Sequence, residues 1–101
     1  MKIQNLSQLK RALTEGAEFQ IIEHFKKPEQ SGQIRVVSKV QTNGIYSKVK
    51  DNPKHEVNQY NNGKGSWVKF GKASEWTFTE AVGVENLCTR AGVWTITVID
   101  K

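Results

Sequence analysis

The chain has 101 residues, a hydrophobic fraction of 37% and a net charge of +5 at neutral pH. This length allows one hydrophobic core, and three Trp, four Phe and two Tyr supply more large apolar side chains than a disordered chain carries. No apolar run approaches the roughly 18 residues of a membrane span, and one cysteine excludes an intramolecular disulfide and a thiolate metal cluster. We therefore expect one cytoplasmic domain, 1–101, with no membrane partner.

The first predicted element is a short amphipathic helix. Leu6, Leu9 and Leu13 recur at helical spacing and form an apolar stripe. Asn5 can cap the first turn, and Gly16 can end the helix in the left-handed conformation. The sequence predicts a helix over residues 6–14 that covers the core.

Short alternating or β-branched stretches predict the strands of an antiparallel sheet. They lie at 18–25, 33–42, 45–50, 67–70, 75–79 and 93–99. Ile22 and Glu23 interrupt the alternation of the first stretch, and residues 84–90 fit either a strand or a helical turn. The predicted fold is α+β, an N-terminal helix packed on a strongly twisted antiparallel sheet of about five or six strands, or on a small open barrel.

The strongest local signal is the Asn43-Gly44 dipeptide between two of these strands. A two-residue type I′ turn needs positive φ at both central positions, which Asn-Gly tolerates. With this turn, Lys39 lies opposite Lys48, and the hairpin has two distinct faces. The outer face presents Arg35, Val37, Lys39, Gln41, Tyr46, Lys48 and Lys50, and the other face presents Ile34, Val36 and Val40.

The basic residues are concentrated in the middle of the chain. Residues 26–72 contain ten Lys or Arg against three Asp or Glu, a net charge of +7, whereas the remainder carries −2. Two lysines directly opposite each other are unfavourable by up to about 1 kcal/mol, so the pair Lys39 and Lys48 favours an external anion. On a surface that binds nucleic acid, basic side chains contact phosphates and an aromatic ring stacks on a base, so the outer face of the hairpin has the composition of such a surface. A solvated face that serves only solubility is the alternative interpretation.

The first functional hypothesis is therefore a non-enzymatic accessory protein that binds DNA or RNA independently of sequence. Its expected contact residues are Arg35, Lys39, Tyr46, Lys48 and Lys50, and the positive field is extended by Lys54, Lys64, Lys69 and Lys72. The rival hypothesis is a protein-interaction or inhibitor module that uses aromatic side chains and a long loop on an acidic protein partner.

The long loop is predicted over residues 51–66, which are rich in Asn, Lys and Gly and indicate a mobile segment. Within it, Gly63, Lys64, Gly65 and Ser66 could form a backbone nest for an anion, although a turn before a strand is the simpler interpretation. The spacing of this segment is not that of a Walker A loop. A third hypothesis, a domain that binds a small molecule or anion, depends on it.

Catalytic arrangements are sparse. Cys88 has no His near it in sequence, and His24 and His55 lack the spacing of a metal site or a catalytic triad. We therefore predict neither enzymatic activity nor a metal or cofactor. The tryptophans Trp67, Trp76 and Trp94 are expected in the core rather than in a stacking surface.

Three segments carry a resemblance to known proteins. They are Val40 to Gly44 with Tyr46 and Ser47, Asn62 to Trp67, and Gly71 to Ser74. These segments resemble short, functionally uncharacterised proteins carried by mobile elements and prophages of Gram-positive gut bacteria. The resemblance implies a setting, an accessory protein of such an element, and no particular activity.

Overall fold

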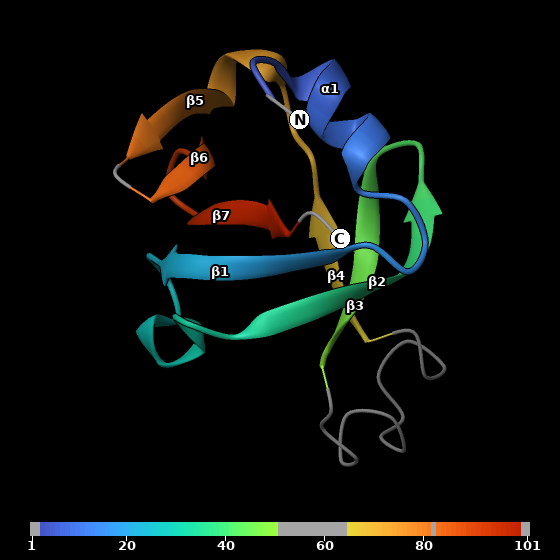
Figure 1. Ribbon diagram of the computed structural model, residues 1–101. Coiled ribbons are helices and arrows are strands. Elements are labelled where there is room, and N and C mark those ends of the chain that lie inside the picture. Colours follow the sequence, from blue (N-terminus) through green and yellow to red (C-terminus); the bar gives the residue numbers. More distant parts are fainter. Residues whose placement is uncertain (1–2, 51–64, 82, 100–101) are drawn as a thin grey trace.

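The computed structural model describes residues 3–50, 65–81 and 83–99, and in these ranges one helix accompanies a seven-stranded antiparallel sheet. The elements are α1 (Leu6–Ala12), β1 (Glu18–His24), η1 (Pro28–Gln30), β2 (Ile34–Gln41), β3 (Gly44–Val49), β4 (Ser66–Lys69), η3 (Ala73–Glu75), β5 (Trp76–Ala81), β6 (Val84–Arg90) and β7 (Trp94–Ile99). The strand order is β4-β3-β2-β1-β7-β6-β5, so β4 and β5 are the two edges (Figure 1). The helix and antiparallel sheet are confirmed, but the sheet has more strands than expected and is not closed into a barrel.

The additional strand is β6, where periodicity does not distinguish a strand from a helical turn. Asn86 occupies an inward position of this strand and is buried. Its side-chain oxygen accepts a hydrogen bond from the Ile3 backbone N–H at 2.8 Å, which offsets the cost of burying the amide. Cys88, two residues later, is fully buried on the same face. A satisfied polar residue in a core position therefore obscures the alternation.

Three register shifts of the kind that β-bulges produce interrupt the pairing of the described strands. One lies between Ile21 and Glu23 in β1, where the sequence pattern is interrupted, one between Val37 and Lys39 in β2, and one between Thr79 and Ala81 in β5. Bulges increase the local twist and turn a strand. Figure 1 shows the result: β1 and β7 run across the view, whereas β3 and β4 run steeply past them.

Helix α1 is shorter than predicted but begins where expected. The Asn5 side chain accepts a hydrogen bond from the Gln8 N–H at 2.9 Å, which confirms the N-cap. The helix ends at Ala12 with Leu13 as its C-cap, so the expected termination at Gly16 is wrong. Gly16 does have a positive φ of 87°, but it uses this in the turn before β1. No helix in the described ranges has the length and apolar character needed to cross a membrane.

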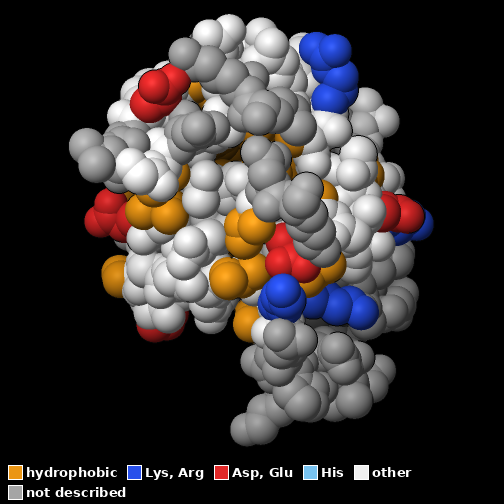
Figure 2. Space-filling model, viewed as in Figure 1, with side chains coloured by type: hydrophobic (Ala, Val, Ile, Leu, Met, Phe, Trp, Pro, Cys, Tyr) orange, Lys and Arg blue, Asp and Glu red, His pale blue; other side chains and the backbone are white. Residues whose placement is uncertain are grey.

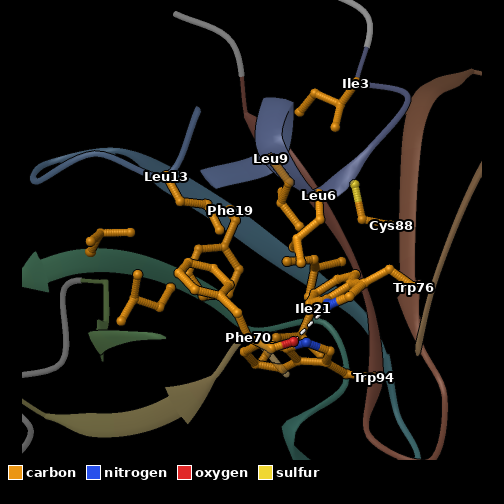
Figure 3. Packing of buried hydrophobic residues seen from close by; sticks show 13 residues of the cluster. Ile3, Leu6, Leu9, Leu13, Phe19, Ile21, Phe70, Trp76, Cys88 and Trp94 are labelled. Atoms are coloured by element: carbon orange, nitrogen blue, oxygen red, sulfur yellow. Dashed lines mark hydrogen bonds between the residues drawn. The ribbon is translucent and has the colours of Figure 1, made fainter. Parts of the chain in front are cut away.

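The core lies between α1 and the concave side of the bent sheet (Figure 3). The leucines of the helix stripe, Leu6, Leu9 and Leu13, are all buried in it, as predicted. Phe19 and Trp94 meet edge to face, with ring centroids 5.6 Å apart. Trp76 donates from its indole nitrogen to the Phe70 carbonyl oxygen at 2.7 Å, which satisfies its one polar group inside the core.

The two edges of the sheet are joined by a short connection. Residues 70–75 connect β4 to β5 and include η3. The Arg90 guanidinium, from the end of β6, donates to the Lys69 carbonyl oxygen at the end of β4 and pairs with Glu75 at 3.4 Å. No ladder pairs β4 with β5 in the described residues, so side chains rather than strand pairing link the two edges.

Candidate nucleic-acid interface

The β2–β3 hairpin has a different register from the predicted one. Gln41 pairs with Gly44, so the turn residues are Thr42 and Asn43 rather than Asn43 and Gly44. Lys39 lies opposite Tyr46, and Lys48 lies opposite Val36. The predicted opposition of Lys39 and Lys48 is therefore wrong, and so is the argument for an anion between them.

Gly44 is needed for the approach of β4, which explains why it belongs to the strand. A Cβ atom at this position would collide with the Val68 carbonyl oxygen and would lie 2.8 Å from the Trp67 ring. Only glycine leaves β3 and β4 room to pair here. The dipeptide that indicates a turn thus serves a contact with a strand more than twenty residues away in sequence.

Arg35 is not on the outer face. Arg35 is only 3% exposed, and its guanidinium donates hydrogen bonds to the side-chain oxygens of Gln33 at 3.1 Å and Gln30 at 3.0 Å. Burial lowers the pKa of Arg35. Val37, on the same face, is also buried, so the predicted assignment of the two faces of β2 is reversed at this end. Two glutamine side chains therefore accept hydrogen bonds from the guanidinium, while the aliphatic part of the arginine side chain is buried.

Lys50 follows β3 and is engaged by an acidic residue. Its Nζ atom lies 2.9 Å from Oε1 of Glu18, whose side chain is largely buried. Figure 2 shows one face of the molecule, where basic side chains appear at separate places and acidic side chains lie beside some of them. The charge of Lys50 is therefore paired with a largely buried carboxylate, although the lysine side chain itself is 42% exposed.

The aromatic and basic residues come together on the outer face of β2, β3 and β4. Lys39, Tyr46 and Trp67 form one row across these strands, because Tyr46 pairs with both of the others. The Tyr46 and Trp67 rings lie 4.8 Å apart at an angle of 48°. Trp67 is 39% exposed, so its predicted place in the core is wrong. Trp76 and Trp94 are buried as expected.

Two further lysines flank this row. Side chains two residues apart on a strand share a face, which places Lys48 beside Tyr46 and Lys69 beside Trp67. Among the described residues, no carboxylate forms an ion pair with Lys39, Lys48 or Lys69. We name this surface the β2–β4 platform; its residues are Lys39, Tyr46, Lys48, Trp67 and Lys69.

Two hollows adjoin the platform and share the turn residues Thr42 and Asn43. The first, of about 410 Å³, is lined by Tyr46 and Trp67 together with Gln41 and the turn. The second, of about 300 Å³, is more basic. Its wall contains Lys10, Lys69, Lys72 and Arg90, and we name it the basic pocket.

The sequence identifies only half of the basic pocket. Lys69 and Lys72 belong to the predicted positive field, but Lys10 and Arg90 lie outside the basic middle of the chain. They reach the pocket because α1 covers the sheet and because the 70–75 connection brings β6 beside the end of β4. No local pattern carries that information.

The predicted loop 51–66 is described only at its end. Lys54, Gly63 and Lys64 lie outside the described residues. Gly65 has a φ of 92° and packs against the backbone of Ser47, and Ser66 begins β4 opposite the same residue. Gly65 and Ser66 therefore lead into β4, the strand that carries Trp67.

The platform offers an exposed indole, a half-buried tyrosine ring and ammonium groups at one place. Aromatic rings and ammonium groups are the groups that contact unpaired bases and phosphates. Comparison of the chain with protein families, curated proteins and solved structures found no match.

Proposed function

We propose that this chain is a non-enzymatic accessory protein, of the mobile-element kind that the resemblance implies, and that it binds single-stranded nucleic acid independently of sequence. The observation that carries the proposal is the row Lys39, Tyr46 and Trp67, which ends on an exposed indole at the edge of the sheet. Lys39 and the flanking Lys48 and Lys69 form no ion pair with a carboxylate of the described residues. An indole exposed on a strand face exposes apolar area to water, and a stacked base would cover it.

The arrangement favours a single strand over a duplex. Stacking needs the flat face of a base, which is exposed in a single strand and covered by neighbouring pairs in a duplex. Stacking on an aromatic side chain contributes about 1–3 kcal/mol per base and tolerates all bases. The interactions available to a duplex on this surface are those of phosphates with the platform lysines, and these depend steeply on salt.

Trp67 provides the first test of this proposal. We expect Trp67→Ala to weaken binding of a fluorescein-labelled single strand at least about tenfold, because about 1.4 kcal/mol of missing stacking energy corresponds to that factor. Fluorescence anisotropy at about 50 and 200 mM salt measures the dissociation constants. Phe25→Ala is the matched control, because Phe25 is a comparably exposed aromatic residue, 43% exposed, beyond the end of β1. Equal affinity of the two variants would contradict the stacking role.

The platform lysines provide the second test. We expect Lys39→Glu/Lys48→Glu to abolish salt-sensitive binding, since both substitutions place a carboxylate where a phosphate would lie. The control is Lys26→Glu/Lys27→Glu, which changes the net charge by the same amount. Both lysines are exposed and lie just before η1, and Gln30 of η1 binds Arg35 at the end of β2 away from the hairpin turn. If both double variants weaken binding equally, the effect is one of net charge and the platform is not the site.

Failure of the wild-type chain to bind any oligonucleotide at low salt would overturn the proposal. The platform would then fit the rival function, a module for an acidic protein partner in which an exposed tryptophan is a typical anchor.

A further inference from the structure

The basic pocket gathers cationic side chains from four separate parts of the fold. Lys10 comes from α1, Lys69 from the end of β4, Lys72 from the 70–75 connection and Arg90 from β6. Cations brought together by the fold around one hollow repel one another, and an anion between them would relieve this repulsion.

One carboxylate in the wall offsets part of this charge. Oε2 of Glu75 lies 3.4 Å from Nη2 of Arg90, and Oε1 accepts a hydrogen bond from the Lys72 backbone N–H at 3.3 Å. The hydrogen bond from the Lys72 backbone and the interactions with Arg90 lower the pKa of Glu75. Glu75 therefore offsets the charge of Arg90 and part of the charge of Lys72. Among the described residues, no carboxylate forms an ion pair with Lys10, Lys69 or Lys72.

The backbone holds this arrangement open. Gly71 has a φ of 70°, and a Cβ atom there would lie 2.8 Å from Nη2 of Arg90 and 2.9 Å from Oε2 of Glu75. A side chain at this position would press on the ion pair in the wall. Lys10 is held beside the pocket, with Nζ 5.2 Å from the centre of the Phe70 ring.

The pocket is also connected to the aromatic hollow. The Phe70 backbone N–H donates to the Asn43 carbonyl oxygen at 2.7 Å, which fixes the pocket against the hairpin turn. Thr42 and Asn43 line both hollows, so the two hollows are neighbours at the hairpin turn.

We infer that the basic pocket binds a phosphate group, and, building on the proposed function, that this phosphate belongs to the strand whose base stacks on Trp67. Lys10, Lys69 and Lys72 supply the ammonium donors, and Arg90 adds positive charge while it holds the wall in place. The phosphate comes either from the 5′ end of the strand or from its interior, and the two sources share the same chemistry.

The test compares Lys10→Gln/Lys72→Gln with the control Lys26→Gln/Lys27→Gln, which removes the same charge elsewhere. The probes are oligothymidylates of about ten nucleotides, a length within the usual site sizes of single-strand binders, with a 5′-phosphate or a 5′-hydroxyl. We expect the pocket variant to bind about tenfold more weakly than the control, as removal of charge-assisted hydrogen bonds predicts. The slope of log K against log salt should shrink by about 0.7 for each phosphate that the variant no longer neutralises.

The outcomes separate the inference from the proposed function. A loss of affinity restricted to the 5′-phosphorylated probe identifies a terminal phosphate, and an equal loss with both probes identifies an internal one. If the wild type binds both probes and the pocket variant binds as tightly as the control, the inference is wrong and the proposed function stands. If the wild type binds neither probe, the proposed function fails and the inference fails with it.

Discussion

Cys88 is enclosed in β6 and has no exposed surface. Burial raises the pKa of its thiol to about 11. Because the thiolate is the reactive form of cysteine, the folded chain keeps this residue both inaccessible and protonated at neutral pH. Cys88 therefore packs as a small apolar side chain beside Ile96, its partner on β7.

At the residue scale, we therefore expect the reactivity of the Cys88 thiol to serve as a probe of unfolding. We expect a thiol reagent such as 5,5′-dithiobis(2-nitrobenzoate) at pH 8 to react with the native chain orders of magnitude more slowly than with the chain in urea, because reaction requires opening of β6. The absorbance of the released thiolate measures the rate. Reaction of the native chain at the rate of an exposed cysteine would contradict the burial of β6.

At the scale of elements, the pairing of β3 with β4 decides whether the platform exists. Tyr46 and Trp67 are neighbours only because Gly44 lets the two strands approach. Substitution at this one position therefore acts on a ligand-binding surface through the backbone rather than through a direct interaction with the ligand.

We expect Gly44→Ala to lower the free energy of unfolding by about 1–3 kcal/mol, since the added methyl group collides with the backbone of Val68 and the strands must separate. The substitution should also weaken binding of a single strand, because the Tyr46 and Trp67 rings move apart. Urea unfolding and anisotropy measure the two effects. Gly16→Ala is the control for a destabilising substitution away from the platform: alanine is strained at a φ of 87°, although its Cβ meets nothing within 4 Å, and binding should be unchanged. Wild-type binding by Gly44→Ala would show that β4 tolerates the methyl group.

The elements themselves are predictable because their signals are local. The leucine stripe and Asn5 indicate α1, and alternation indicates most strands. The register of the hairpin is not predictable from local signals. Gly44 is required by the close approach of β4, and the bulge in β2 reverses the faces of the residues on its far side. The predictions for Arg35 and Trp67 are wrong for a related reason: side-chain type gives average burial, whereas these two positions are set by Gln30 and by an edge strand.

At the scale of the whole molecule, the candidate site is predictable only in part. Hairpin alternation places Lys39, Tyr46 and Lys48 on one face, where the structure also has them, whereas the charge distribution assigns Lys69 only to a wider positive field. The basic pocket requires knowledge of how α1 and β6 meet the 70–75 connection, which depends on the order of strands in the sheet. Strand order is a tertiary property that a single sequence does not specify locally.

Stability of the whole chain should depend on pH through His24. Its pKa is lowered by burial first, then by Lys27 and Arg35, with Glu29 acting in the opposite direction. Its Nδ1 atom accepts a hydrogen bond from the Lys27 N–H at 3.0 Å, which requires that nitrogen to be unprotonated. The unfolded chain therefore takes up a proton near the ordinary pKa of 6.5 before the folded chain does, and stability is lost as pH falls below that value.

We expect the free energy of unfolding to fall between about pH 7.5 and pH 5.5 more steeply for the wild type than for His24→Asn, which keeps an acceptor without the titration. Urea unfolding at several pH values measures the slopes, and His55 is common to both chains and cancels in the comparison. Parallel slopes would mean that His24 has the same proton affinity in both states.

The order of the sheet also has a consequence for the order of folding. β1 lies in the middle of the sheet and pairs with β7, which follows every other strand of this sheet in the sequence. The half of the sheet that carries the platform, β2 to β4, uses consecutive strands and closes only short stretches of chain. The core under α1 also needs Trp94 and Ile96, whose pairing with β1 closes most of the chain, so the aromatic surface can take shape before the domain beneath it is complete.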